Sequence, residues 1–540
     1  MTRGRSDAAF LLPVVAFVVL FALLPVAVLF ADSLGAAGGA AGTLGILAEA
    51  QNVRAVQNSL VQGGVSALLA VMIGYPAGVF VGRYDWPGRS AVRSFLLVPF
   101  LLPSLVVVFG VLDLFGPAGV LSSAVPALSV LGSGLPAIVV ANLLFNVPIV
   151  VLFTAAGCEG TSVELEETVA TLGGSPARAY ADVWARPTWV GAVAGGLLTF
   201  LFSALSFAPP LLLCGPGCYT VEARIWFLDT LGLQPTAAGV LSAATVAVFL
   251  VPTAAYLLVL ARLRSAGTRG GRRVRAGRGT SLLWFGLAAE TALVLLSVFG
   301  LLGAVLYRTL VPAGGGGPGS AWSALFSAGT TGRLGISAVG ALGNTLFFAI
   351  VAAAIAVVLG IVTGYAVSRR PRRAGGIGLL LFVPLLLSPV VLAFSLAEFW
   401  RPLLGGESTV WVLVIVSQAA LALPLALQSL EIPLAGLSPQ EREVARTLGA
   451  TSWTAFLDAD LPRVREGLIT AGLFAFALGL GEFTATYFLV TPTFTTLPVA
   501  LYTLANARLA PVADAAAGLL LLLSLAVFSV LVVGGRRVEL

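Results

Sequence analysis

Apolar segments recur along the whole chain, and each is long enough to cross a lipid bilayer. A helix needs about 20 apolar residues to cross about 30 Å of hydrocarbon, and about twelve segments reach that length. Backbone N–H and C=O groups inside lipid find no water to bond, so each segment is expected to form an α-helix. We place the segments near residues 8–30, 58–82, 94–116, 134–157, 190–213, 236–261, 282–307, 342–367, 376–400, 409–430, 467–490 and 511–534. The pattern predicts an all-α integral membrane protein whose first segment is a retained helix and not a cleaved signal peptide.

The composition agrees with this class and excludes several others. Hydrophobic residues make up 58% and charged residues 10% of the 540 positions, which is not the composition of a soluble globular chain. The chain has no histidine and no lysine. A Walker A phosphate loop requires its lysine, and histidine triads and histidine metal sites are excluded as well. The chain is therefore not expected to hydrolyse ATP by that route or to hold a histidine metal site. That it is non-catalytic, with no metal, no cofactor of its own and no nucleic-acid partner, is an expectation that the resemblance given below implies.

Three cysteines in a chain of this length give no disulfide framework. Cys214 and Cys218 stand four positions apart in a loop, where a bridge outside the cell is one reading. The sequence favours the other reading, in which both thiols are unpaired.

One polar stretch, Leu437 to Pro462, lies between two apolar segments. Ser438 as N-cap, followed by proline and by Glu441 at the third helical position, is a strong helix start. Gly449 interrupts the pattern, and Thr451 is placed to cap a second short helix. The stretch therefore predicts two short helices joined at a glycine outside the bilayer.

The same pattern occurs earlier in the chain. At an offset of 276 positions, Glu167, Thr171-Leu172-Gly173 and Ala179-Tyr180 match Glu443, Thr447-Leu448-Gly449 and Ala455-Phe456. Similar offsets relate Pro148 to Pro424, Asn58-Ser59 to Asn344-Thr345, Gly74 to Gly360, Gly78 to Gly364 and Phe109 to Phe394. Each half contributes an even number of helices, so the halves point the same way and form two parallel six-helix repeats. We assign residues 1–261 to the first repeat (core about 54–261), 262–281 to an Arg/Gly-rich linker and 282–540 to the second (core about 340–535).

The arginines predict the orientation in the membrane. They gather on one side of the expected topology, at Arg3, Arg5, Arg83, Arg89, Arg93, Arg178, Arg186, the linker 262–281, the run 369–373, Arg442, Arg446, Arg463, Arg465 and Arg536-Arg537. Positive residues mark the cytoplasmic side, so both termini and both polar loops are expected in the cytoplasm of a prokaryotic cell. The basic linker is expected to act as a topology signal that contacts anionic lipid.

The second loop carries a family resemblance. Glu443-Val444-Ala445-Arg446-Thr447-Leu448-Gly449, followed by Leu461-Pro462, resembles the EAA loop of permease subunits of binding-protein-dependent ABC importers. The resemblance covers nearly the whole chain as a fused double permease and implies a type I importer fold. It further implies two kinds of partner, a cytoplasmic ABC ATPase dimer that binds the ATP and an extracytoplasmic solute-binding protein.

More narrowly, the chain resembles thiamine permeases, close to the related iron(III) permeases. The stretches that carry this are Phe145-Asn146-Val147-Pro148, Tyr219 to Trp226 and Thr496 to Tyr502. The first loop departs from the pattern, because Ala170 and Pro187 each stand one place late. The cargo implied is thiamine or a related small cation, with iron(III) as the alternative.

The resemblance implies that the loops contact the ATPase. The coupling residues expected on this basis are Glu167, Gly173, Ala179, Tyr180, Glu443, Ala445, Gly449, Trp453 and Phe456. Tyr180, Trp453 and Phe456 would supply apolar contacts, since aromatic side chains often carry much of an interface. The two glutamates would pair with donors on the ATPase or within the loop, or would only cap their own helices.

Ionisable residues within the apolar segments are candidates for the substrate path, because burying them in a membrane is costly. Glu482 is the first candidate and Asn146 the next, followed by Asp113 and Glu398. The alternative for Asp113 and Glu398 is a position at the wet interface. Acidic lining suits a cationic cargo. Two other classes stay open. One is a secondary transporter driven by an ion gradient, with Glu482 or Glu290 as coupling carboxylate, and the disfavoured one is a membrane-embedded transferase.

Overall fold

The computed structural model describes residues 3–159, 161–266, 274–275, 282–312, 319–335, 337–368, 387–405, 409–437, 439–491 and 494–535. Within these ranges, 11 helices are long and apolar enough to cross a membrane. The prediction of an all-α membrane protein is confirmed. Two short strands, β1 (Tyr84–Asp85) and β2 (Val274–Arg275), pair in parallel over two residues each.

Several sequence assignments fall on positions that are not described. They are the arginine run 369–373, most of the linker 262–281, Ser438 and Arg536-Arg537. Of the apolar segment expected near 376–400, only the end is described, and it forms α22 (Pro389–Trp400).

The chain packs as two compact units. Unit 1 comprises Met1–Ala36 and Ser320–Leu540, and unit 2 comprises Ala37–Gly319. The helices of unit 2 are α3 (Gly39–Ala48), α4 (Ala50–Arg83), α5 (Arg89–Phe95), α6 (Val98–Leu101), α7 (Ser104–Phe115), α8 (Val120–Ala124), η2 (Pro126–Gly132), α9 (Gly134–Glu159), α10 (Val163–Thr171), α11 (Pro176–Ala179), η3 (Tyr180–Ala185), α12 (Arg186–Ala204), α13 (Ala208–Leu213), η4 (Pro216–Cys218), α14 (Val221–Trp226), η5 (Phe227–Leu231), α15 (Pro235–Ala266) and α16 (Leu282–Leu310). The helices of unit 1 are α1 (Arg3–Val18), η1 (Val19–Leu23), α2 (Leu24–Ala36), α17 (Ser320–Leu325), α18 (Ala328–Leu334), α19 (Ala338–Ser368), α22, α23 (Trp411–Ala435), α24 (Pro439–Thr447), α25 (Ser452–Ala455), η7 (Phe456–Asp460), α26 (Leu461–Gly481), α27 (Thr484–Leu489), α28 (Leu497–Asn506) and α29 (Ala510–Gly535).

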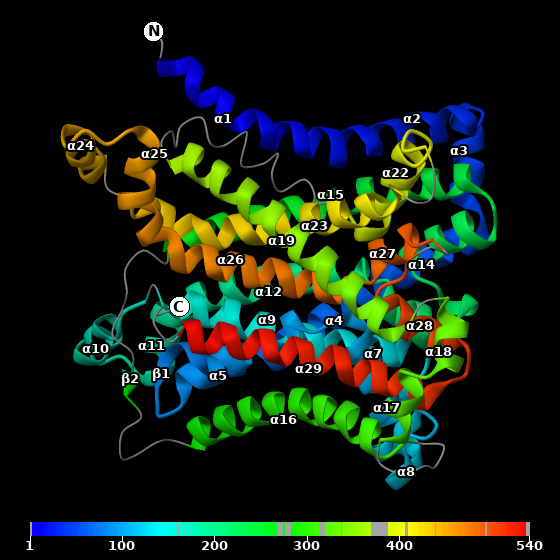
Figure 1. Ribbon diagram of the computed structural model, residues 1–540. Helices are drawn as coiled ribbons and strands as arrows, with labels where there is room; N and C mark the ends of the chain where they lie inside the picture. The colour runs from blue at the N-terminus through cyan, green and yellow to red at the C-terminus, as the bar shows by residue number, and fades with distance from the viewer. Residues whose placement is uncertain are drawn as a thin grey trace. The chain divides into compact units, whose positions relative to one another are not determined.

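The units differ from the repeats read along the sequence. Within unit 2, α16 packs against α4 and α7, although it opens the second repeat in chain order (Figure 1). Within unit 1, α1 packs against α19 and α2 packs against α22, although both belong to the first repeat. The boundaries at residues 261 and 282 remain a prediction about the repeat, whereas the packing divides the chain near residues 36 and 319.

Each unit is built around three long helices that contact one another, α4, α9 and α12 in unit 2 and α19, α23 and α26 in unit 1. Glycines let these backbones approach closely. A Cβ on Gly74 of α4 would lie 2.8 Å from Cβ of Val150 on α9, and one on Gly360 of α19 would lie 3.4 Å from Cβ of Ala426 on α23. Both glycines of this matched pair therefore lie where neighbouring helices pack closely.

Three apolar segments that are predicted to be continuous are broken in the structure. The segment near 94–116 is divided at Leu102–Pro103, between α6 and α7. The segment near 190–213 is divided at Leu205–Phe207, between α12 and α13, and the segment near 467–490 is divided at Glu482–Phe483, between α26 and α27. Pro209 lies in the first turn of α13, where its missing N–H is harmless. The prediction of continuous helices is therefore wrong for these segments, because mean hydropathy does not register a short interruption.

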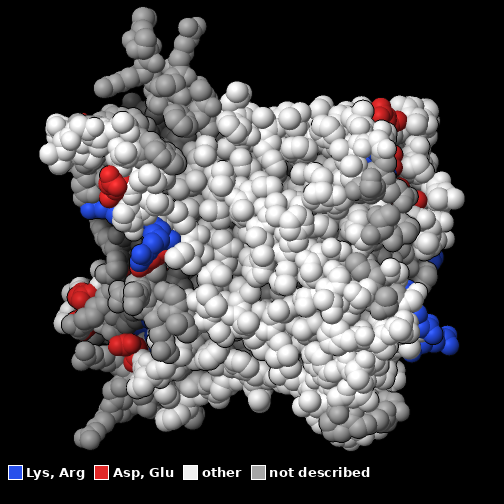
Figure 2. Space-filling view, in the orientation of Figure 1, with Lys and Arg blue, Asp and Glu red and all other residues white. Residues whose placement is uncertain are grey.

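Charged side chains lie toward the left and right margins of the face shown in Figure 2, and the described residues between them on that face are uncharged. Such a distribution suits a chain whose middle lies in lipid.

Candidate functional site

The first polar loop forms two short helices joined by a tight turn, as predicted. Ser162 caps α10 by accepting a hydrogen bond from the backbone N–H of Glu164 at 3.3 Å. At the other end of α10, Gly173 adopts the left-handed conformation with φ of 79°. The N–H of Gly174 donates to the carbonyl of Val169 at 2.9 Å, and that of Gly173 donates to Ala170 at 3.0 Å. This pair of bonds is a Schellman motif, which satisfies the last carbonyls of the helix.

The second polar loop repeats this geometry at matched positions. Gly449 has φ of 91°, and the N–H of Ala450 donates to the carbonyl of Ala445 at 3.0 Å. The next short helix is capped by Thr451, which accepts from the N–H of Thr454 at 3.2 Å.

The agreement extends further along both loops. In the first loop the equivalent cap is Ser175, which accepts from the N–H of Arg178 at 3.3 Å. The wide π-helical turns η3 and η7 begin at Tyr180 and Phe456, which are also matched positions. Within unit 1, α24 stands clear of the ends of the long helices (Figure 1). The two loops are therefore copies in backbone geometry as well as in sequence.

Each loop presents a leucine to solvent immediately before its left-handed glycine. Leu172 is 82% exposed and Leu448 is 83% exposed. Burying such side chains against a partner would be favourable, because each removes apolar surface from water. Neither leucine is among the coupling residues predicted from sequence, although both stand in the triplet that the duplication repeats.

The coupling residues predicted from sequence take different places. Glu167 and Glu443 are exposed, Ala179 is buried at 3% exposure and Ala445 is half-buried. Tyr180 does not point away from the protein, because its hydroxyl is hydrogen-bonded to that of Tyr75 at 2.6 Å. Phe456 is half-buried, and the side chain of Trp453 lies outside the described part of the structure. Contact of these residues with an ATPase stays a prediction.

Glu482, the first candidate for the substrate path, lies at the break between α26 and α27. Its carboxylate accepts hydrogen bonds from the N–H groups of Ala485 and Thr486 and from the Thr486 hydroxyl, each at 2.8 Å. A carboxylate in this position accepts from the first backbone donors of α27, and its negative charge is stabilised by the positive end of the helix dipole. Gln418 on α23 lies nearby, with its Nε2 3.5 Å from the Thr486 hydroxyl.

Asn146 belongs to a buried amide cluster in unit 2. Its Nδ2 donates to the Ser203 hydroxyl at 3.3 Å, while Oδ1 is buried with no hydrogen-bond partner. Asn142, one turn earlier on α9, donates to Gln62 Oε1 at 2.6 Å, and Gln62 in turn donates to the carbonyl of Ser203. The cluster lies beside the break that follows α12, and it is neutral where the sequence analysis expects acidic lining.

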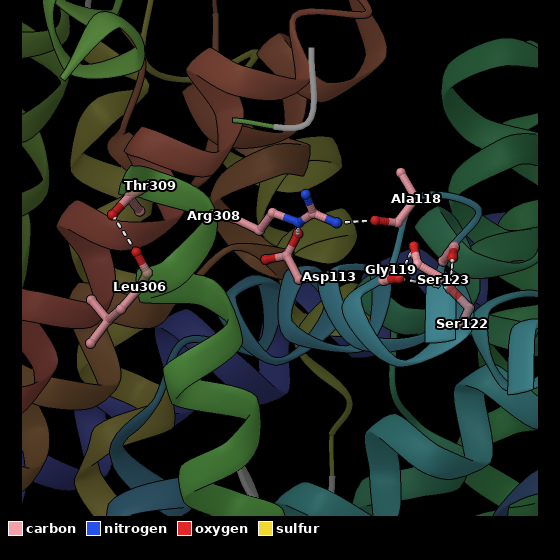
Figure 3. A network of polar contacts seen from close by, with 9 residues as sticks. Asp113, Ala118, Gly119, Ser122, Ser123, Leu306, Arg308 and Thr309 are labelled. Carbon is pink, nitrogen blue, oxygen red and sulfur yellow. Dashed lines mark hydrogen bonds and ion pairs between the residues drawn. The ribbon is translucent and has the colours of Figure 1, made fainter. Parts of the chain in front are cut away.

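Asp113 is engaged by a basic residue on a neighbouring helix. Its Oδ1 lies 3.9 Å from Nε of Arg308 on α16, and both side chains are about nine-tenths buried. The same arginine donates to the carbonyl of Ala118 in the loop after α7 (Figure 3). Glu398 of unit 1 matches Asp113 at the offset that also relates Phe109 to Phe394, and it is exposed. Glu290 on α16 is half-buried.

At matched positions in the two units, a pair of hydrogen bonds, here called a clasp, closes the turn before α14 and the turn before α28. In unit 2, Asn58 Nδ2 donates to the carbonyl of Tyr219 at 3.1 Å, and Ser59 Oγ accepts from the N–H of Val221 at 2.9 Å. In unit 1 the corresponding bonds join Asn344 to Thr495 at 2.9 Å and Thr345 to Leu497 at 2.8 Å. The Asn-Ser and Asn-Thr pairs noted in the sequence thus anchor both turns.

The turn in unit 2 also carries a disulfide between Cys214 and Cys218, whose Cα atoms are 5.7 Å apart. The expectation of two unpaired thiols is therefore wrong. The remaining cysteine, Cys158, is buried and forms no disulfide. Among the described residues, no group of three histidine, cysteine or acidic side chains is arranged to hold a metal ion.

Comparison with known proteins supports the resemblance found in the loops. The profile of the binding-protein-dependent transport system inner membrane component matches residues 74–265. The chain is 25% identical over 504 residues to the thiamine transport system permease protein ThiP of Escherichia coli strain K12, covering 90% of this chain and 89% of that protein. It is 27% identical over 467 residues to ThiP of Brucella abortus strain 2308, covering 79% and 78% of the two chains.

A shorter match is somewhat closer in sequence. The molybdenum transport system permease protein ModB of Escherichia coli strain K12 is 33% identical over 138 residues, which are 23% of this chain and 60% of ModB. The similarity to the ThiP proteins extends over both repeats, whereas the similarity to ModB covers less than half of the chain.

Proposed function

Because the chain is a permease of the binding-protein-dependent ABC importer class, we propose that it carries thiamine, or a related small cation, across the cytoplasmic membrane. The energy comes from a separate ATPase dimer that holds the two polar loops. An extracytoplasmic solute-binding protein delivers the cargo. The permease itself performs no chemistry and binds no cofactor, since ATP is bound by its partner.

The observation that carries the proposal is the identical construction of the two loops. Each has a helix closed by a left-handed glycine, at φ of 79° for Gly173 and 91° for Gly449, and each exposes a leucine beside it. A short rigid element with an exposed apolar side chain suits insertion into a complementary pocket. Two such elements in one chain suit a motor with two equivalent subunits.

The cargo is assigned from the extent of the similarity. ThiP proteins match over 90% and 79% of this chain, so both repeats contribute to the likeness. A cation is also compatible with Glu482, although its carboxylate already caps α27. Molybdate is the competing cargo, because of the match to ModB, and iron(III) is the alternative from sequence.

Purification with the ATPase tests the docking. The tagged chain, expressed with its ATPase, is expected to retain that ATPase in detergent, and Leu172→Glu together with Leu448→Glu is expected to release it. Leu233→Glu is the matched control, since Leu233 is 81% exposed but lies outside both loops. Retention of the ATPase by the double variant would refute docking through these leucines.

Transport assays test the class and the cargo. In liposomes that contain the chain, its ATPase and its binding protein, uptake of labelled thiamine is expected to require ATP and to exceed uptake of molybdate and iron(III). ATP-independent uptake by the chain alone under an ion gradient would instead identify a secondary transporter.

Impermeant thiol labelling in intact cells tests the orientation. Leu448→Cys is expected to react only after the cells are opened, and Leu233→Cys is expected to react without opening. The reverse pattern would exclude cytoplasmic loops.

A further inference from the structure

A buried arginine joins the first polar loop to the membrane-spanning helix α4. Arg83 is the last residue of α4, and its side chain is only 12% exposed. Its Nη2 lies 2.5 Å from Oε1 of Glu166 on α10. The other carboxylate oxygen of Glu166 accepts a hydrogen bond from Nε1 of Trp184 at 2.7 Å. Glu166 therefore binds two groups at once, one on α4 and one on η3.

Aromatic rings enclose the arginine. The guanidinium carbon lies 5.3 Å from the ring centre of Trp184 and 5.2 Å from that of Tyr84. Contacts of this kind stabilise a cation and hold its planar group in one orientation. Trp184 is itself 1% exposed and packs beside Cys158 and Val163.

A chain of hydroxyl groups makes a second connection between the loop and α4. Tyr75 lies two turns before Arg83 on α4, and its hydroxyl is 2.6 Å from that of Tyr180 and 3.0 Å from that of Thr188. Thr188 also donates to the carbonyl of Trp184 at 2.8 Å. The turn η3 is thus tied to α4 by polar contacts at both of its ends.

The attachment of α10 depends on few groups. Val163 is its one buried residue, and most of its other side chains are exposed. Removing one partner of a buried, hydrogen-bonded ion pair leaves the other charge uncompensated, which is strongly unfavourable. The pair of Arg83 and Glu166 is therefore a main restraint on the position of α10.

The second loop lacks the hydroxyl chain. The positions matched to Tyr75, Tyr180 and Thr188 are Ile361, Phe456 and Val464. Ile361 packs in the apolar cluster that contains Val464. These three side chains carry no hydroxyl group, so the hydroxyl chain of the first loop has no counterpart at the matched positions.

We propose that Arg83 is a positioning residue that transmits movement of the first loop to α4. The proposal rests on the proposed function, because it takes the loop as the element that the ATPase moves. In the first loop, displacement of α10 pulls on the end of α4 through Glu166.

Amide hydrogen exchange of α4 in the complex of chain and ATPase tests the proposal. In the unaltered complex, ATP with vanadate is expected to change exchange in the last turns of α4. Arg83→Ala and Glu166→Gln are expected to reduce that change by about tenfold, within the range of ordinary coupling energies. Arg83→Lys keeps the charge and is expected to retain most of the response.

Arg178→Ala is the matched control in the same loop. Arg178 pairs with Asp182 at 3.4 Å, but the two side chains are 74% and 56% exposed, so the pair contributes little. The proposal is overturned if α4 responds to ATP in Arg83→Ala as in the unaltered complex, or if Arg178→Ala abolishes the response equally.

Exchange in the isolated chain separates this proposal from the proposed function. Without any ATPase, Arg83→Ala is expected to raise exchange across α10 by about tenfold, since α10 loses its main restraint. Unchanged exchange in α10 would refute the restraint even if the ATPase binds. Failure of the ATPase to bind the unaltered chain would refute the proposed function and leave this measurement to decide on the restraint.

Discussion

Ser59 Oγ accepts a hydrogen bond from the backbone N–H of Val221 across 2.9 Å, although 162 positions separate the two residues. The equivalent bond between Thr345 and Leu497 is 2.8 Å long. Two buried clasps of the same kind, at positions related by duplication, show that the repeat preserves tertiary contacts as well as local motifs.

Breaking either clasp is expected to destabilise the protein. Ser59→Ala and Thr345→Val each leave a buried N–H without its acceptor, which costs about 1–3 kcal/mol. Thermal unfolding in detergent should show a lower midpoint for both variants. Ser129→Ala, at an exposed hydroxyl that bonds only the carbonyl three residues earlier, should leave the midpoint unchanged. Equal midpoints for all three variants would contradict the role of the clasps.

The left-handed glycines are expected to tolerate no side chain without strain. A left-handed conformation costs an ordinary residue about 1–2 kcal/mol. Nothing lies within 4 Å of a Cβ built on Gly173 or Gly449, so the penalty is conformational and not a clash. Gly173→Ala and Gly449→Ala should therefore lower retention of the ATPase by roughly 5-fold to 30-fold.

The control for the glycine variants is Gly45→Ala. Gly45 lies inside α3, also with open space around a Cβ, and alanine is preferred there by the helix. Loss of ATPase binding in this variant, or full binding by the loop variants, would be evidence against the assigned turn geometry.

The pair of Asp113 and Arg308 is expected to be structural. Asp113→Asn leaves Arg308 buried without its counter-charge, and disruption of buried pairs typically costs about 3–5 kcal/mol. A fall in the unfolding midpoint and in the yield of folded protein would be the readout. Glu398→Gln, at the exposed matched position, should stay within about 0.5 kcal/mol of the unaltered chain.

A combined replacement distinguishes structure from transport. Asp113→Leu with Arg308→Met removes both charges and should recover much of the stability lost in Asp113→Asn. If the double replacement is stable yet abolishes uptake of the cargo, Asp113 belongs to the path after all.

The disulfide determines how many thiols an alkylating reagent can modify before reduction. Under denaturing, non-reducing conditions, alkylation should modify Cys158 alone, and reduction should add two further sites, as measured by intact-mass spectrometry. Closing so short a loop is expected to stabilise the turn before α14 by about 2 kcal/mol. Three modified thiols before reduction would show that the bridge does not form.

The duplication was the part of the fold most accessible from sequence, because it needs only matched residues at a constant offset. The cap at Ser175, the glycine turns and the clasps of Asn58 and Asn344 all lie at positions that the duplication matches. The breaks near Ser206 and Glu482 are not predicted, because a single polar residue changes the mean hydropathy of a long segment very little. At the second break, the carboxylate of Glu482 binds backbone donors of α27, and this contact is visible only in the folded chain.

The candidate site was predicted in part. The loops and their glycines were found, but Tyr180 was expected to face a partner and is hydrogen-bonded to Tyr75 instead. An aromatic residue on a short helix has two possible faces, and the choice depends on a hydroxyl 105 positions away. The pairing of Arg83 with Glu166 was missed for the same reason, since charges far apart in sequence carry no mark of their contact.

The exchange of first helices between the repeats has a consequence for any attempt to divide the polypeptide. A fragment ending at residue 261 would lack α16, which completes unit 2, and a fragment starting at residue 282 would lack α1 and α2, which complete unit 1. Neither piece carries a full set of its own packing neighbours. Separately expressed halves should therefore be insoluble or degraded when alone and be rescued only by complementation with each other.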